Sequence, residues 1–399
     1  MRIVLSYGLL GRGGDAVQVQ SMAEALEQLG HDVTLVGAAS IIPYEFGTSA
    51  AHLRRMLRRL PWWVKDALGL ALRVRVNRSL RRALKPGAPD LVIHRAGMYD
   101  VTGTRLAKIC PVIAHLDAPF AVERAYRGER YLKSRHERAM CSLGESSRLI
   151  LTPSEAAKAH YEGMGIPAEK IVVMPNGVSR EQLALGQEWS RRHPPLSPKG
   201  HCTLGFVGSL SRWHGVDLLL MALQLLNRER AGSFRLRVVG RGEEFDRLRE
   251  LTRTLGLGEQ VDWLGAVPQQ QAFEEIASFD IAVLPHTLST GAPMKLFEYA
   301  AMARPMIAPD LLNLRALFSA DESRFFTPES PKALADVVLD LVANPERARE
   351  LGLRAQKRAE GYSWESILEN VLRLAGAGES RGADRAREAG NRSSTPRQT

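Results

Sequence analysis

Short apolar strands alternate with helical segments along almost the whole chain, and this alternation constrains the fold more than any other feature. Residues 2–6 have the character of a buried strand, and apolar residues then recur at helical spacing from Val19 to Leu29, before Gly30. Further strands are predicted at 33–36, 91–93, 112–114, 149–151 and 171–173. Short buried strands separated by helices are typical of parallel sheets covered on both faces. The first half is therefore predicted to be a doubly wound α/β domain.

The alternation stops at a proline-rich segment, 191–200, and then restarts. Strands are predicted at 203–207, 236–239, 261–264, 281–284 and 306–308, and helices at 216–227, 243–255, 331–342, 345–359 and 363–374. A chain of 399 residues is also long enough for two domains. The pattern predicts two Rossmann-like domains that face a cleft, followed by a polar tail expected to be disordered.

Composition limits the classes of partner and compartment. The formal net charge of +10 favours anionic partners, which include nucleotides, anionic lipid and nucleic acid, although no nucleic-acid-binding module is recognised. No apolar run reaches the roughly 18 residues of a membrane-spanning helix, and residues 1–6 are too short for a signal peptide. Cys110, Cys141 and Cys202 are too scattered for a disulfide framework or a zinc site, which favours a reducing cytoplasm.

The segment Met294–Tyr299 points most directly to a ligand. It follows a predicted strand, 281–284, and a polar loop, and it opens a helix. The N–H groups at a helix start favour anions such as phosphate. Glu298 lies one turn further on, where its carboxylate can accept hydrogen bonds from a diol. A ligand with a phosphate at the helix start and a pair of hydroxyls beside Glu298 would be a nucleotide sugar, and the segment is predicted to bind one.

Two glycine-rich turns follow strands. The first, 8–15, includes Gly13 and Gly14 and offers backbone N–H donors, but it lacks the spacing of a dinucleotide fingerprint, and a plain tight turn is an equal alternative. The second begins at Gly208 and Ser209 and continues to Arg212 and His214. These two cationic side chains are candidates to neutralise a departing diphosphate. The alternative is a local capping role for His214.

Other polar groups are predicted at the carboxyl ends of strands, where doubly wound sheets bind ligands. His115 and Asp117 follow one strand in the first half and are expected to face the cleft. In the second half, the segment 263–268, which includes Val267, closes another strand and could present backbone groups to a base. A structural role remains the alternative at both places.

Residues 52–85 carry two basic amphipathic helices around Trp62 and Trp63, with Asp66 as the single acid. Such helices suit the head-group region of an anionic membrane. The alternative is that the apolar stripe packs on the domain core and the basic face is solvated.

Taken in order, these segments resemble glycosyltransferase family 4, the retaining enzymes of GT-B fold. The resemblance extends to about residue 375 and rests on five segments: the first glycine-rich turn, Pro175–Val178, Phe206–Gly215, Val239–Gly242 and Lys295–Tyr299. It implies transfer of a sugar from a nucleotide-diphosphate sugar without a metal or other cofactor. It also implies an acceptor domain, a donor domain and a last helix that crosses back to the first domain.

The resemblance assigns roles to individual residues. Glu298 matches the second glutamate of an E-x7-E motif, which binds the ribose hydroxyls, and Thr290 stands where the first glutamate would fall. The arginine and lysine that hold the diphosphate in relatives fall at Ser209 and His214, so Arg212, His214 or Lys295 must supply the charge. His115 matches a cleft histidine that meets the sugar. Arg241 and Leu296 lie within matched segments and are assigned to donor binding, with Gly208 and Val267.

The predicted organisation is an acceptor domain at 1–188, a linker at 189–200, a donor domain at 201–361, a crossover helix at 362–375 and a tail at 376–399. The predicted activity is retaining glycosyl transfer from a nucleotide-diphosphate sugar to a lipid-linked or polysaccharide acceptor in cell-surface glycan assembly. The predicted location is cytoplasmic, peripheral to the inner face of the membrane. The alternatives are a nucleotide-sugar 2-epimerase of GT-B fold and an inactive nucleotide-sugar-binding homologue.

Overall fold

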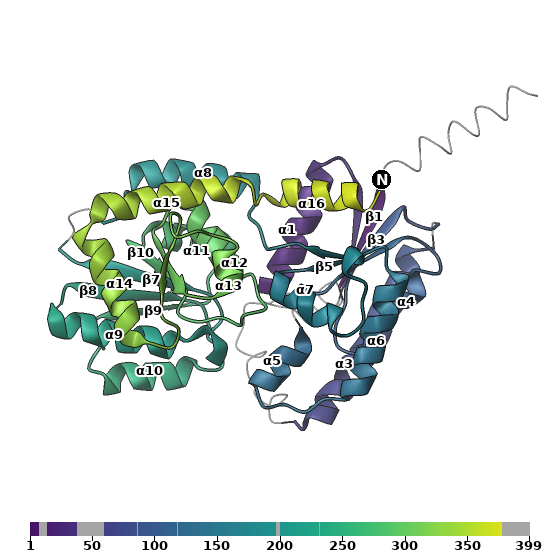
Figure 1. The fold of residues 1–399 in the computed structure, drawn as a ribbon, viewed down its shortest axis with the longest axis horizontal. Coiled ribbons are helices and arrows are strands. Elements are labelled where there is room, and N and C mark those ends of the chain that lie inside the picture. Colours follow the sequence, from purple (N-terminus) through teal and green to yellow (C-terminus); the bar gives the residue numbers. More distant parts are fainter. Residues whose placement is uncertain are drawn as a thin grey trace, which may run out of the picture.

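The chain forms two α/β halves joined side by side (Figure 1). The structure, a computed structural model, describes residues 1–7, 14–37, 60–85, 87–117, 119–196, 200–230 and 232–376. Each half is built on a six-stranded sheet whose paired strands are parallel, as the buried alternating pattern predicts. The predicted fold class, with two Rossmann-like units, is confirmed.

The first sheet has the strand order β2-β1-β3-β4-β5-β6. Its strands are β1 (Arg2–Tyr7), β2 (Asp32–Gly37), β3 (Leu91–Arg95), β4 (Val112–His115), β5 (Leu149–Thr152) and β6 (Ile171–Val173). Its helices are α1 (Gly14–Gln28), α3 (Trp62–Ala83), α4 (Thr102–Leu106), α5 (Phe120–Tyr126), α6 (Lys133–Ser146), α7 (Glu155–Glu162) and the 3-10 turn η1 (Ala168–Lys170). Residues 52–59 of the predicted basic helices, the turn 8–13 and the tail from 377 lie outside the described residues.

The second sheet has the order β12-β11-β10-β7-β8-β9. Its strands are β7 (Cys202–Val207), β8 (Phe234–Val239), β9 (Val261–Gly265), β10 (Ile281–Val283), β11 (Met306–Pro309) and β12 (Arg324–Phe326). Its helices include η2 (Arg212–His214), α9 (Val216–Glu229), α10 (Phe245–Thr254), α11 (Gln269–Ala277), α12 (Met294–Ala301), α13 (Leu312–Arg315), α14 (Pro331–Ala343) and α15 (Pro345–Glu360). The sequence pattern did not reveal β12 or α13.

Helix α8 (Arg180–Arg192) packs on the second half, and the predicted boundary at residue 188 falls inside it. Its Gly186 lies so close to α12 that a Cβ there would come within 1.9 Å of the Ala301 carbonyl oxygen. A larger residue would force the two helices apart. Because α8 belongs to the second half by packing, we place the passage between the halves before it, in residues 174–179.

Helix α16 (Trp364–Leu374) lies against α1 of the first half, at the segment predicted to cross back (Figure 1). Its Trp364, Leu368 and Val371 are buried in the same apolar cluster as β1. A bridge between Val178 and Ser363 joins the two passages of the chain. The halves are thus connected at two neighbouring points. Segments that follow the carboxyl ends of both sheets meet at the junction, where Ser154 after β5 contacts Thr290 after β10.

Candidate functional site

Helix α12 is fixed above the carboxyl ends of β7 and β10 by a buried tyrosine. The hydroxyl oxygen of Tyr299 accepts a hydrogen bond from the Val207 N–H at 3.0 Å and donates to the Val283 carbonyl at 3.5 Å. Phe297 on the same helix is fully buried. Within the described ranges no side chain caps the start of α12 at Pro293, so its first N–H groups are not taken by a capping residue there. The helix start can therefore receive an anion.

Lys295, in the first turn of α12, places a buried amine at the end of β7. Its Nζ has no hydrogen-bond partner among the described residues and lies 4.6 Å from the centre of the Phe206 ring. Gly208 makes room for it, because a Cβ at that position would come within 2.9 Å of the amine nitrogen. Since a buried amine without a partner is costly, this geometry is suited to an anionic ligand that would satisfy it.

Lys295 and Glu298 lie one helix turn apart, and each favours the charged form of the other. Burial lowers the pKa of Lys295 from its ordinary value to about 7, although the nearby Glu298 raises it. Burial likewise raises the pKa of the Glu298 carboxyl to about 7, against the effect of Lys295. Both groups therefore titrate near neutral pH in the free protein. Perturbed ionisable groups of this kind cluster at ligand sites.

His214 and its neighbours lie on the turn that follows β7. The Nδ1 of His214 is in hydrogen-bond contact with the Ser209 carbonyl and lies 3.3 Å from the Ser209 hydroxyl. Burial, together with the charge of Lys295, lowers the pKa of His214 to about 3. The positive charge predicted for His214 is therefore absent from the free protein near pH 7. Arg212 is exposed on the same turn, so among the described residues of this turn and of α12 the buried cation is Lys295.

Close backbone contacts between the ends of β7 and β8 border this turn. The Gly208 N–H donates to the Val239 carbonyl at 2.9 Å, and a Cβ on Gly240 would come within 1.9 Å of the Gly208 carbonyl oxygen. Arg241 is exposed and lies over the Phe245 ring at 5.0 Å. Val267 is half-buried against the core of the second half. These residues share the carboxyl edge of the second sheet with Lys295.

The first half contributes a polar network beside Asp117, which follows β4. Arg95 donates to the Asp117 carboxylate at 2.6 Å, and the Gln18 amide donates to its other oxygen at 3.1 Å. Gln18 also donates to the side-chain oxygen of Asn176. Burial raises the pKa of Asp117, but the charge of Arg95 and the hydrogen bonds from Arg95 and Gln18 hold this pKa below its ordinary value. The carboxylate is therefore ionised and held in place.

The same network reaches the loop that precedes α12. The Asn176 amide donates to the Ala292 carbonyl at 2.6 Å, and the Ser154 hydroxyl donates to the Thr290 carbonyl at 2.8 Å. From the second half, the Asn313 amide donates to the Gly291 carbonyl at 2.7 Å. Thr290 thus contacts the first half through its backbone. The loop that sets the start of α12 is fixed by both halves.

The remaining predicted residues are placed as follows. His115 ends β4, is buried, and lies 4.0 Å from the Asp117 carboxylate, and burial lowers its pKa to about 4, so the imidazole is neutral. Leu296 is buried in the core, and its N–H donates to the Pro293 carbonyl at 3.2 Å. Gly14 is the first residue of α1, and Gly13 lies outside the described residues.

Helix α5 touches the second half near His214. The Tyr126 ring lies 6.1 Å from that of His286, and the Arg127 guanidinium lies 4.4 Å from the centre of the Trp213 ring. His286 Nδ1 donates to the Trp213 carbonyl at 2.7 Å. Aromatic and cation–π contacts therefore connect α5 to the turn after β7.

Sequence reasoning missed Gln18, Arg95 and the role of Asn176. Their partners are far away in the sequence, so no local pattern connects them. One available signal was the position of Gln18, a polar residue beside Val19 in the apolar repeat of α1, where it is 3% exposed. A buried amide requires a partner, and here the partners are the groups of the network.

Comparisons with known proteins agree with this architecture. Residues 12–182 match the family model described as Glycosyltransferase Family 4, and residues 187–358 match Glycosyl transferases group 1. The D-inositol 3-phosphate glycosyltransferase of Nocardia farcinica is 26% identical over 267 residues, which cover 65% of this chain and 56% of that protein. The chain therefore spans little more than half the length of this curated relative.

Two solved structures are similar over 94% of this chain, each at 16% identity. One is Anabaena Alr3699/HepE in complex with UDP, with a TM-score of 0.69 over 100% of that chain. The other is the sucrose-phosphate synthase of Thermosynechococcus elongatus, with a TM-score of 0.72 over 98% of that chain. These likenesses support the GT-B fold.

The two family matches follow one another along most of the sequence. The chain thus belongs to the glycosyltransferases, with a family 4 first half and a group 1 second half.

Proposed function

We propose that the protein is a retaining glycosyltransferase that moves a sugar from a nucleotide-diphosphate sugar to a lipid-linked or polysaccharide acceptor. The observation that carries this proposal is the buried amine of Lys295 beside Gly208, which has no partner in the described part of the chain, with Glu298 one turn further along α12. A diphosphate would pair with the amine and the helix start, and the ribose diol would donate to the Glu298 carboxylate.

The chemistry follows from this arrangement. The bond between the sugar C1 and the diphosphate oxygen breaks, and Lys295 with the start of α12 stabilises the negative charge on the leaving group. The acceptor hydroxyl attacks C1 on the same face and passes its proton to the departing phosphate oxygen. In this scheme the charge is supplied by Lys295 and Arg212 rather than by a metal, and no protein nucleophile is needed.

The first half would hold the sugar and the acceptor. Asp117 is ionised and fixed by Arg95 and Gln18, so it can accept hydrogen bonds from sugar or acceptor hydroxyls. Neutral His115 lies beside it. We propose that these two groups orient the sugar, while Asn176 and Ser154 fix the loop that carries Thr290.

We further propose that the protein works in the cytoplasm on the inner face of a membrane in cell-surface glycan assembly. No helix within the described ranges is both long and apolar enough to span a bilayer. The exposed Trp63 and the basic residues of α3 support peripheral contact with anionic lipid.

A thermal-shift screen against UDP-, GDP-, ADP- and dTDP-sugars tests the proposed donor class. A ligand of the native state at a hundredfold excess over its Kd adds about 2.7 kcal/mol to the free energy of unfolding, which should raise Tm by several degrees. UDP-sugars come first in the screen because a structural neighbour is bound to UDP-glucose. If no sugar nucleotide raises Tm, the proposal is wrong.

A further inference from the structure

The outer face of the first half, away from the junction between the halves, combines arginines with exposed apolar side chains. A groove of about 420 Å³ lies between α3, α4 and α6. Its lining contains Arg73, Arg105, Arg135 and Arg138, and the described residues contribute no acid to it. Leu70, Val74 and Val101 supply apolar walls. The groove therefore presents positive charge beside apolar surface.

One of the four arginines, the half-buried Arg73, lacks hydrogen-bond partners for part of its guanidinium among the described residues. Arg73 donates through one terminal nitrogen to the Met98 carbonyl, and its charge also interacts with the buried Asp100 carboxylate. Its Nε and its other terminal nitrogen are buried and have no hydrogen-bond partner among the described residues. A guanidinium has a fork of donors that matches phosphate geometry, so an anion in the groove would satisfy the groups that the protein leaves unpaired.

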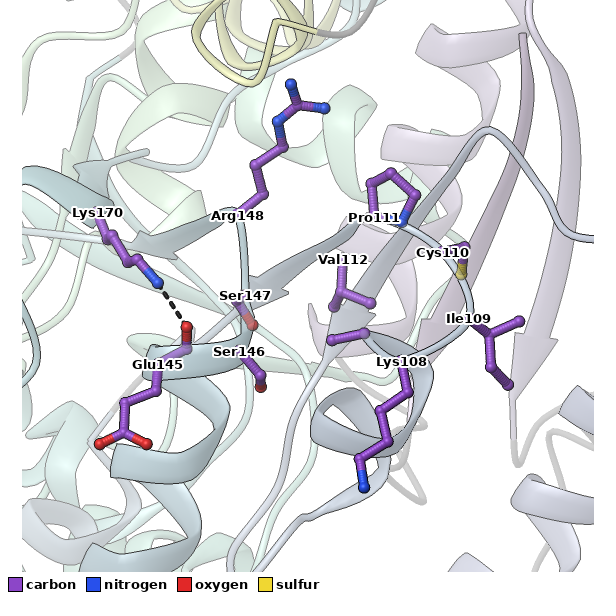
Figure 2. Close-up of a pocket in the computed structure, with 11 residues that line it drawn as sticks. Lys108, Ile109, Cys110, Pro111, Val112, Glu145, Ser146, Ser147, Arg148 and Lys170 are labelled. Atoms are coloured by element: carbon purple, nitrogen blue, oxygen red, sulfur yellow. Dashed lines mark hydrogen bonds between the residues drawn. The ribbon is translucent and has the colours of Figure 1, made fainter.

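A second hollow, of about 530 Å³, continues along the same pair of helices, α4 and α6 (Figure 2). It lies between the loop after α4, which carries Lys108 and Ile109, and the end of α6 beside Lys170. Its lining adds three basic residues and one acid, Glu145. Positive charge therefore extends across the face rather than stopping at the groove.

Apolar residues are exposed on the same elements. The exposed large apolar side chains on α3, beside α4 and before α6 are Trp63, Leu68, Val74, Val101, Ile109 and Leu132. Trp63 is 61% exposed and Ile109 is 60% exposed. Apolar side chains gathered among basic ones mark an interaction surface, and this mixture suits the boundary between head groups and acyl chains.

We propose that the groove between α3, α4 and α6 binds the phosphate of an anionic phospholipid and seats the protein on the bilayer. Arg73 and the three exposed arginines would hold the phosphate, while Val74 and Val101 meet the acyl region. Arg124 of α5 is paired with Asp66 of α3, so this face adjoins the helix that contacts the second half through Arg127. This site rests on the peripheral membrane contact that is part of the proposed function, and it locates that contact in the groove. It does not depend on whether the protein transfers a sugar.

The test compares two triple variants of the full chain that lose the same charge. One is R105Q/R135Q/R138Q in the groove, and the control is R228Q/R230Q/R347Q, three exposed arginines of the second half. Vesicle flotation uses phosphatidylcholine alone and phosphatidylcholine with phosphatidylglycerol. The expected result is that wild type and control float only with phosphatidylglycerol, while the groove variant partitions on the order of a hundredfold less, at about fivefold for each arginine.

Equal losses in both triple variants would show that net charge rather than the groove binds the membrane, and would overturn the proposal. Failure of the wild-type protein to float would do the same, as would saturable binding of inorganic phosphate with no vesicle binding. Val74→Asp supplies a second variant, which should also lose flotation, because a charge would enter the acyl region. The Tm shift produced by a sugar nucleotide should be unchanged in the groove variant, which separates this proposal from that of donor binding.

Discussion

Replacing Lys295 by methionine will lower kcat/KM for sugar transfer on the order of a hundredfold to a thousandfold, because it removes the buried charge that meets the leaving diphosphate. The same substitution will raise the Tm of the free protein at pH 7 by about 2 °C or more. Methionine fills a similar space without a charge, so the cost of burying the amine disappears. Steady-state kinetics and a thermal melt without donor measure the two effects.

The gain in stability has a defined pH dependence. The pKa of Lys295 is about 7 in the folded protein, below its ordinary value of 10.5, so the unfolded chain binds the proton more tightly. The free energy of unfolding of the wild type therefore rises as pH increases from 7 to 10.5, while this contribution is absent from Lys295→Met. The Tm difference between the two proteins should be largest near or below pH 7 and shrink toward pH 10.

Lys357→Met is the matched control, because Lys357 is an exposed lysine on α15. It should change neither Tm nor kcat/KM. If Lys295→Met kept full activity, the amine would have no part in leaving-group departure. If it were active and less stable than the wild type, Lys295 would be a structural residue.

Replacing Glu298 by alanine will weaken binding of the sugar nucleotide about tenfold to a hundredfold. It removes a charged acceptor from the ribose diol and leaves those hydroxyls without a partner. Lys295 also loses the carboxylate that favours its charged form. Isothermal titration calorimetry with the donor identified by the thermal-shift screen gives the two dissociation constants.

Glu298→Gln separates the charge from the shape of the side chain. Because the pKa of Glu298 is about 7, donor affinity of the wild type should fall as pH decreases from 7 to 5 and the carboxylate is protonated. Glutamine keeps an acceptor but cannot be protonated in that range, so its affinity should be lower at pH 7 and flat below it. Glu274→Ala, at an exposed position on α11, serves as the control and should bind like the wild type. An unchanged Kd for Glu298→Ala would remove Glu298 from the donor site.

The sequence predicted the sheets and the donor helix because their signals are local. Short apolar runs that form strands, and the segment Lys295–Tyr299, can each be recognised within a few residues. The division between α5 and α6 could not be predicted in the same way: the chain breaks near Gly128, which has a φ of +66°. The apolar spacing continues across that break and concealed it.

The parts of the site that could not be predicted depend on contacts between distant residues. The space for the Lys295 amine comes from Gly208, on another strand end, and the neutral state of His214 comes from burial and from Lys295. The network from Gln18 to Asn176 spans both ends of the first half. No spacing rule relates these positions, so the motif could name Lys295 and Glu298 but not what surrounds them.

The measurement that tests the central claim most directly is the anomeric configuration of the product, followed by NMR with the donor that raises Tm. The protein is predicted to release the nucleoside diphosphate and to form a product with the same anomeric configuration as the donor, and Lys295→Met should suppress both. An inverted product would contradict retaining transfer. Conversion of the donor to its 2-epimer without any acceptor, or no turnover of a donor that binds, would contradict glycosyl transfer itself.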